Sequence, residues 1–174
     1  DDPFLAGTIG GYESKGAQSK GMYVYSKHFV LNAQETTRVS YCSWITEQAF
    51  RQEHLRAFEL AIEIGDAMNV MTSFSRVGSC WSGNSYNLLT KCLRGEFGMR
   101  GFAVTDWFKN TGMGMANGLL AGQDLPDGFS SDEIKNYGPG TGNGDLAQAA
   151  RNSARRILYT VANSLAMNFF GNNT

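Results

Sequence analysis

The heptapeptide Gly101-Phe-Ala-Val-Thr-Asp106-Trp107 predicts a buried strand that ends on a carboxylate. Its small, aromatic and β-branched residues are typical of strands, and Asp106 follows them where the strand would end. Two further strands are predicted upstream, over residues 21–30 and 69–74, and a short fourth strand is predicted over residues 121–125. Strands of this length, placed at these intervals, leave room for a helix between each pair.

The clearest helix lies between the first two strands. Thr46 is its predicted cap and Gly65 its predicted end, and four apolar residues recur at helical spacing between them: Phe50, Leu55, Phe58 and Ile62. A second helix is predicted after the capping residue Ser85 and ends at Gly95. Shorter helical stretches are predicted over residues 5–20 and 113–120.

A long helix closes the predicted pattern. Asp145 and Gln148 have the spacing of a capping box at its start, and the helix is expected to end near Met167. Its predicted apolar face consists of Leu146, Ala150, Ala154, Ile157, Val161 and Leu165. A Gly-, Asp- and Ser-rich loop over residues 126–144 precedes it.

Alternating strands and helices predict an α/β fold built from βα units with a parallel sheet. A closed (β/α)8 barrel needs eight such units and about 250 residues, so 174 residues supply roughly its second half, or else a small open α/β sheet. In both cases a binding site is expected at the C-terminal ends of the strands. The two open sheet edges of a half barrel would pair with the missing half or with another chain.

Composition excludes several classes of function. Fifteen Lys and Arg residues against sixteen Asp and Glu give a formal net charge of −1, with no basic stripe for nucleic acid. The apolar stretches are too short to span a bilayer. Cys42, Cys80 and Cys92 form no Cys-x-x-Cys pair and His28 and His54 lie far apart, so we expect free thiols, no metal site and no cofactor. The unpaired cysteines favour the cytoplasm over secretion.

Several side chains with chemical potential fall at the predicted strand ends. Lys27 and His28 end the first strand, and Asp106 and Trp107 end the third. Such a set suits a sugar, because charged groups bind its hydroxyls, an aromatic ring covers its apolar face, and a carboxylate can attack its anomeric carbon. The alternatives are a surface lysine beside a core histidine, and a helix-capping role for Asp106.

Five motifs in the same order and at matching separations resemble the family 3 glycoside hydrolases of the β-glucosidase type. They are Lys27-His28-Phe29, Asn32-x-Gln34-Glu35-x-x-Arg38, Val70-Met71-Thr72-Ser73-Phe74, Leu93-Arg94-Gly95-Glu96-Phe97-Gly98 and Gly101-Phe-x-Val-Thr-Asp-Trp107. The resemblance covers nearly the whole chain. It implies that residues 1–174 are the later part of the family's N-terminal (β/α)8 catalytic domain, without the early barrel strands and without the following sandwich domain.

The resemblance also implies roles for individual residues. Asp106 matches the catalytic nucleophile, and the residues that match substrate contacts are Lys27, His28, Arg38, Met71, Phe74 and Trp107. Phe74 departs from the family, which commonly has a tyrosine there. Because Val30-Leu31-Asn32-Ala33 stands where the N-acetylglucosaminidase branch has Pro-Gly-His-Gly, the resemblance favours the β-glucosidase or β-xylosidase branch.

The implied activity is that of a retaining exo-β-glycosidase acting on terminal β-linked glucosides, xylosides or oligosaccharides. No residue matches the family's acid/base, which usually comes from a later domain, and Glu35, Asp124 and Asp127 are substitutes without motif support. We therefore expect the isolated chain to be inactive. The alternative is a noncatalytic fragment or remnant, with a sugar-binding or structural role, that needs a partner chain to complete the barrel.

Overall fold

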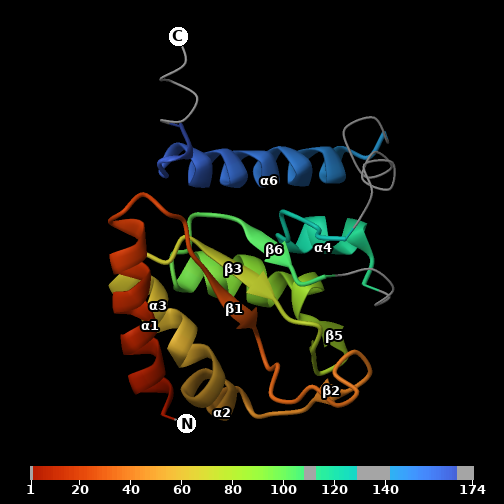
Figure 1. The fold of residues 1–174 in the computed structure, drawn as a ribbon. Coiled ribbons are helices and arrows are strands. Elements are labelled where there is room, and N and C mark those ends of the chain that lie inside the picture. The colour runs from red at the N-terminus through yellow and green to blue at the C-terminus, as the bar shows by residue number, and fades with distance from the viewer. Residues whose placement is uncertain (1, 108–112, 129–141, 168–174) are drawn as a thin grey trace.

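The main sheet of the protein is parallel (Figure 1). The structure is a computed structural model that describes residues 2–107, 113–128 and 142–167. The main sheet consists of β1 (Tyr25–Phe29), β3 (Asn69–Thr72) and β6 (Ala103–Thr105), in the order β1-β3-β6. Both neighbouring pairs of strands run in the same direction. The predicted α/β class with parallel strands is confirmed. Because the strands are parallel, the residues that follow them lie together at the C-terminal end of the sheet.

The predicted fourth strand is reduced to one bridge. Leu125 pairs in parallel with Val104, but Ala121 is the last residue of a helix and Gly122 ends that helix with a φ of 107°. Gly122 takes this left-handed conformation without the steric penalty that a Cβ would bring. The prediction of a strand over 121–125 was therefore wrong for all but its last residue.

Helices join and cover the strands. The helix between β1 and β3 runs through α2 (Glu47–Ala49), the π-helical turns η1 (Phe50–Leu55) and α3 (Arg56–Gly65). Thr46 Oγ1 accepts a hydrogen bond from Ala49 N, which confirms the predicted cap. Phe50, Leu55 and Ile62 are buried on its inner face, as their spacing predicted.

The remaining crossovers follow the same plan. Helix α1 (Pro3–Gln18) precedes β1 and packs beside α3, and η3 (Asn87–Glu96) joins β3 to β6. Ser85 Oγ accepts a hydrogen bond from Leu88 N at the start of η3, as expected of a cap. Helix α4 (Met115–Ala121) follows β6 and packs against the last helix.

Helix α6 (Gly144–Ala162) lies where the sheet strands begin (Figure 1). Its cap is Asn143, whose side chain accepts hydrogen bonds from Asp145 N and Leu146 N, so the predicted capping box at Asp145 was wrong. The helix ends at Ala162 rather than near Met167, and Ala154 is exposed while Thr160 is fully buried. Thr160 Oγ1 donates to Asn69 Oδ1 at 2.8 Å, and this polar contact sets the inward face of the helix.

A second sheet was missed by the sequence prediction. It is formed by β2 (Cys42–Ser43), β4 (Arg76–Val77) and β5 (Cys80–Trp81), and the 3-10 turn η2 (Ser82–Asn84) follows it. The Arg76 guanidinium stacks over the Trp81 ring at 4.0 Å and helps hold the hairpin together. Strands of two residues are too short to show a periodicity in the sequence.

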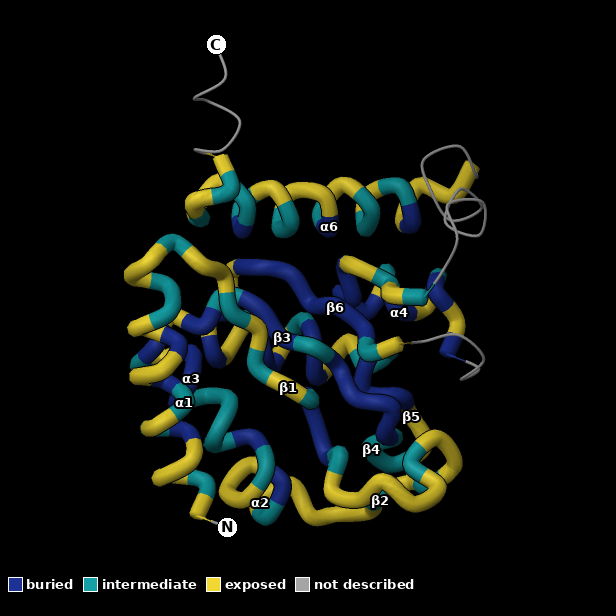
Figure 2. Tube along the Cα trace, viewed as in Figure 1, coloured by how far each residue is buried: buried dark blue, intermediate teal, exposed yellow. Residues whose placement is uncertain are grey.

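Burial is concentrated in β3, in β6, at the end of β1 and on the inner faces of the helices (Figure 2). Phe29, Val70, Leu89, Leu93 and Ala103 are at most 1% exposed and form the centre of one apolar cluster. None of the described helices is both long and apolar enough to cross a bilayer. The core thus fixes the strand ends against a rigid helical layer.

Candidate active site

The C-terminal ends of β1 and β6 bring His28 and Asp106 together. His28 Nε2 lies 3.5 Å from Asp106 Oδ2, and Arg38 Nη1 lies 3.9 Å from the same carboxylate oxygen. Asp106 is the first residue after β6, and its backbone N–H donates to Thr72 O at the end of β3. The Asp106 carboxylate and the His28 imidazole therefore converge at one rim of the sheet, as the sequence predicted, and the Arg38 guanidinium lies beside them.

His28 is held in an environment that disfavours its charged form. Burial is the largest cause that lowers the pKa of His28, and the cations Lys27 and Arg38 lower it further, while the Asp106 carboxylate opposes them. The imidazole is therefore neutral at pH 7. A neutral ring can both donate a hydrogen bond and accept one.

Arg38 lies against the ring of Phe74. The guanidinium carbon is 4.6 Å from the ring centre, and Phe74 itself is 5% exposed. The ring provides a cation–π contact that orients the charge of Arg38 toward the rim. The predicted residues Arg38 and Phe74 are thus in contact with each other as well as close to Asp106.

Three other predicted residues lie around this centre. Lys27 is exposed on β1 and acts on His28 through its charge, whereas Met71 is half-buried in β3. Trp107, directly after Asp106, is 61% exposed. The backbone N–H of Trp107 donates to Asp106 Oδ1 at 2.7 Å, which orients the carboxylate.

Two residues hold Arg38 in place, and neither of them was predicted from the sequence as a partner of Arg38. Glu35 Oε2 lies 3.0 Å from Arg38 Nη1, and Glu35 Oε1 accepts a hydrogen bond of 3.1 Å from Asn32 Nδ2. Glu35 and Arg38 are three residues apart in one short loop, and this spacing of opposite charges is the signal that could have predicted the contact.

A hollow of about 310 Å3 opens beside His28. Lys27, His28 and Asn32 form one wall, and Glu53, His54 and Phe58 from the helix after β1 form the other. Its volume is at the lower end of the range for small-molecule sites. Two predicted substrate contacts thus line a space that a ligand can enter.

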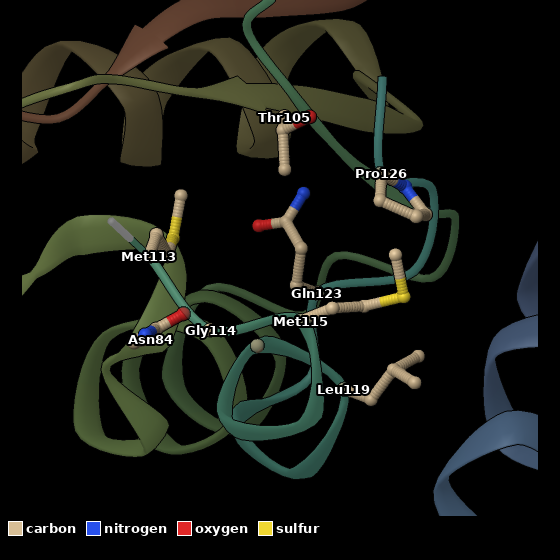
Figure 3. Close-up of a pocket in the computed structure, with 9 residues that line it drawn as sticks. Asn84, Thr105, Met113, Gly114, Met115, Leu119, Gln123 and Pro126 are labelled. Carbon is tan, nitrogen blue, oxygen red and sulfur yellow. The ribbon is translucent and has the colours of Figure 1, made fainter. Parts of the chain in front are cut away.

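A second cavity lies behind the rim, next to β6 and α4 (Figure 3). Its lining includes Thr105, Met113, Met115, Gln123 and Pro126, with Thr105 directly preceding Asp106. None of its described lining residues is charged, so these residues offer no charge-assisted hydrogen bond to a sugar hydroxyl. We therefore assign the candidate site to the rim and not to this cavity.

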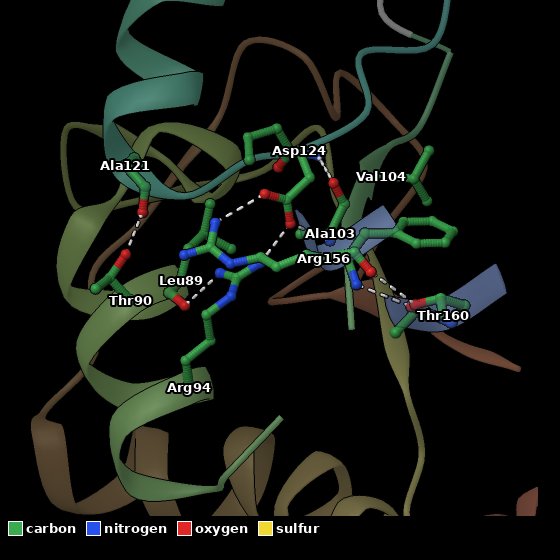
Figure 4. Close-up of polar contacts among 12 residues, drawn as sticks. Leu89, Thr90, Arg94, Ala103, Val104, Ala121, Asp124, Arg156 and Thr160 are labelled. Atoms are coloured by element: carbon green, nitrogen blue, oxygen red, sulfur yellow. Dashed lines mark hydrogen bonds and ion pairs between the residues drawn. The ribbon is translucent and has the colours of Figure 1, made fainter. Parts of the chain in front are cut away.

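Asp124, one of the acidic residues considered as a substitute acid/base from the sequence, lies away from the rim in a buried network (Figure 4). Arg94 Nη2 and Arg156 Nη1 donate to its two oxygens at 2.6 and 2.8 Å, and Ala103 N donates to Oδ2 at the start of β6. Burial lowers the pKa of Arg94 to about 10, against the opposing effect of the Asp124 carboxylate, and the nearby charge of Arg156 lowers it further. Asp124 is a structural anion and is removed from the possible acid/base residues.

Comparison with known proteins identifies the family of the chain. Residues 1–121 match the family description "Glycosyl hydrolase family 3 N terminal domain". The chain is 40% identical to a β-glucosidase of Ruminococcus albus over 110 residues, which are 63% of this chain and 12% of that protein. It is 38% identical to β-glucosidase B of Emericella nidulans over 125 residues, 72% of this chain and 15% of that protein.

A solved structure shares the fold of almost the entire chain. The structure of β-glucosidase 3B from Thermotoga neapolitana in complex with glucose matches 97% of this chain and 25% of its own, with a TM-score of 0.83 and 28% identity. The chain therefore spans between about an eighth and a quarter of the length of these relatives. With its family description, its relatives and its fold in agreement, the chain belongs to glycosyl hydrolase family 3.

Proposed function

We propose that the protein containing this chain is a retaining exo-β-glycosidase of the β-glucosidase or β-xylosidase type, with Asp106 as its nucleophile. The observation that carries this proposal is the position of Asp106 at the C-terminal end of β6, 3.5 Å from His28 and 3.9 Å from Arg38. The membership in glycosyl hydrolase family 3 supports a glycoside as substrate.

The proposed reaction has two displacements. An oxygen of Asp106 attacks the anomeric carbon while the bond to the leaving-group oxygen breaks and that oxygen takes a proton from a carboxylic acid. Water then attacks the anomeric carbon of this glycosyl ester, and the bond to Asp106 breaks and returns Asp106 to its carboxylate form. The proton of the water goes to the carboxylate that had served as the acid, and the sugar leaves with its original anomeric configuration.

The surrounding side chains bind and orient the sugar in this proposal. Lys27, His28 and Arg38 would form hydrogen bonds with its hydroxyls, because all three carry donors at the rim. The exposed ring of Trp107 would cover an apolar face of the substrate, and Met71 and Phe74 would close the pocket below it.

The acid/base is proposed to come from outside the residues assigned here. Among the described carboxylates, Asp124 is buried between two arginines and Glu35 is paired with Arg38. We propose that residues 1–174 are part of a (β/α)8 catalytic domain, completed by early barrel strands and a sandwich domain, and that the isolated chain does not turn over substrate.

One observation favours the second candidate, a noncatalytic piece that pairs with another chain. Within the part of the chain that the structure describes, β1 has a strand neighbour on one side only. An unpaired edge is a template for another strand. Appreciable hydrolysis of an aryl β-glucoside by the purified 174-residue chain would contradict the need for a partner.

The nucleophile is tested by substitution in the full-length protein. Asp106→Ala is expected to fold normally and to lower turnover by about four orders of magnitude or more, because it removes the covalent route. Azide should partly restore cleavage and give the α-glycosyl azide. A 2-deoxy-2-fluoro glycoside should label the wild-type protein on Asp106.

The matched control is Asp66→Asn, which removes an exposed carboxylate paired with Arg100 and leaves the rim unchanged. This variant is expected to keep wild-type turnover. Near-normal activity of Asp106→Ala, or a label on another carboxylate, would overturn the assignment of Asp106.

A further inference from the structure

We infer that Glu35 is a positioning residue that holds the Arg38 guanidinium off the nucleophile Asp106. This inference rests on the proposed function, because it gives Asp106 the role of nucleophile. Arg38 Nη1 lies between two carboxylates, 3.0 Å from Glu35 Oε2 and 3.9 Å from Asp106 Oδ2. The guanidinium is therefore shared unequally, and the nearer partner is the residue that takes no part in the reaction.

Three contacts fix Arg38 in this intermediate position. Its guanidinium stacks on Phe74 with 4.6 Å between the guanidinium carbon and the ring centre. Glu35 Oε2 pairs with its Nη1, and Asn32 Nδ2 donates to the other oxygen of Glu35 at 3.1 Å. A glutamate on its own at an exposed loop would move among rotamers, and the bond from Asn32 restricts it.

The chemistry of a nucleophilic carboxylate explains why such a restraint is useful. Asp106 must be ionised to attack, so a nearby cation supports the reactive form. A close ion pair would also stabilise the free carboxylate more than the bound ester, in which the negative charge has been lost, and this would raise the barrier to attack. Keeping Arg38 at 3.9 Å supplies charge without a closed ion pair.

Glu35 is not placed as the missing acid. Its carboxylate oxygen and that of Asp106 are at most about 7 Å apart, since Arg38 Nη1 lies within 3.0 and 3.9 Å of them, and that bound alone would admit the spacing of a glycosidase pair. However, both of its oxygens accept contacts from donors, Arg38 and Asn32, and an acid must instead donate a proton.

Among the residues that the structure describes, several charged and titratable groups act on this centre. Asp106 faces His28 from β1 and Arg38 from the loop after it, and Lys27 and Glu35 also act on the His28 imidazole through their charges. Of these, Glu35 can be neutralised without removing a proposed contact to the sugar or to Asp106. Its side chain is 70% exposed, so its removal leaves the fold intact.

The test compares Glu35→Gln with wild type in the full-length enzyme, after 2-deoxy-2-fluoro labelling has located the nucleophile. Without the Glu35 charge, Arg38 closes on Asp106 and stabilises the free carboxylate more than the glycosyl ester. We therefore expect kcat to fall about tenfold and the pH profile of kcat/KM to move by about one pH unit toward acid. Glu35→Asp retains the charge and should recover most of both effects.

A matched control is available in the same chain. Glu59 pairs with Arg56 at 2.7 Å with the same three-residue spacing, on a helix away from the rim, so Glu59→Gln should leave the pH profile unchanged. With the label on Asp106, a Glu35→Gln profile identical to that of Glu59→Gln would overturn the positioning role alone. A label elsewhere would overturn the proposed nucleophile and, with it, this inference.

Discussion

His28 illustrates how a single side chain at the rim reports on its neighbours. The Asp106 carboxylate raises its pKa, whereas burial and the charges of Lys27 and Arg38 lower it, and the net effect is a pKa below the ordinary 6.5. Because the unfolded chain binds this proton more readily, the histidine's contribution to stability is complete above pH 6.5 and is lost as the pH falls below it. The titration of one ring thus tests the geometry of the entire cluster.

Two substitutions should move that titration in opposite directions. Asp106→Asn removes the carboxylate and should lower the pKa of His28 further, while Lys27→Gln removes a cation and should raise it. Both shifts are measurable by NMR titration of the imidazole, with the resonance assigned by its loss in His28→Gln. Shifts in the same direction for both variants would show that Lys27 and Asp106 do not both act on His28.

At the scale of elements, the contact of α1 with α3 depends on glycine. A Cβ on Gly7 would stand 2.8 Å from the backbone of Ala57, and a Cβ on Gly11 would stand 2.8 Å from Ile64 Cβ. The two helices therefore approach more closely than any larger residue would allow. A Cβ on Gly10, on the same helix, would meet no described atom within 4 Å outside its chain neighbours and the backbone of its own helix.

This difference gives a matched pair of variants. Gly7→Ala should destabilise the fold by about 1–3 kcal/mol, because the helices must move apart to admit the methyl group. Gly10→Ala should stabilise it by about 1 kcal/mol, since alanine is the better helix former and meets no atom there. Urea denaturation measures both free energies of unfolding. Equal effects at the two positions would contradict the close packing of α1 on α3.

At the scale of the whole molecule, stability and proposed chemistry lie at opposite ends of the sheet. Asp106 and His28 are at the C-terminal ends of the strands, whereas Asp124 bonds Ala103 N at the start of β6. Through Arg94 and Arg156, Asp124 also connects η3 and α6 to that strand. The Asp124 side chain is 0% exposed, so this network is a buried polar connection among β6, η3 and α6.

Removing the negative charge of Asp124 should lower the free energy of unfolding. Asp124→Asn leaves two arginines without their anion and should destabilise the fold by about 3–5 kcal/mol. Asp66→Asn, which breaks the exposed pair with Arg100, should change stability by no more than about 1 kcal/mol. Chemical denaturation of both variants distinguishes the two cases. Similar small losses for both would show that the Asp124 network does not hold the elements together.

Much of this organisation could be predicted from the sequence, because long periodic segments determine which residues are buried. The three main strands and the helix containing Phe50 and Ile62 are examples, as is the convergence of His28 with Asp106. Other features depend on contacts between distant residues. The inward face of α6 follows from the bond between Thr160 and Asn69, and a polar residue such as Asp124 is predicted to be exposed until its partners are known.

The separation between the buried network around Asp124 and the rim at Asp106 also affects how such a protein can evolve. Loops at the rim can accept new residues or lengths, and selection can test each change for a new binding preference, while the network around Asp124 keeps its full contribution to folding. A lineage can thus explore substrates through changes that leave the folded population unaltered. Divergence of specificity then needs no compensating mutation in the core.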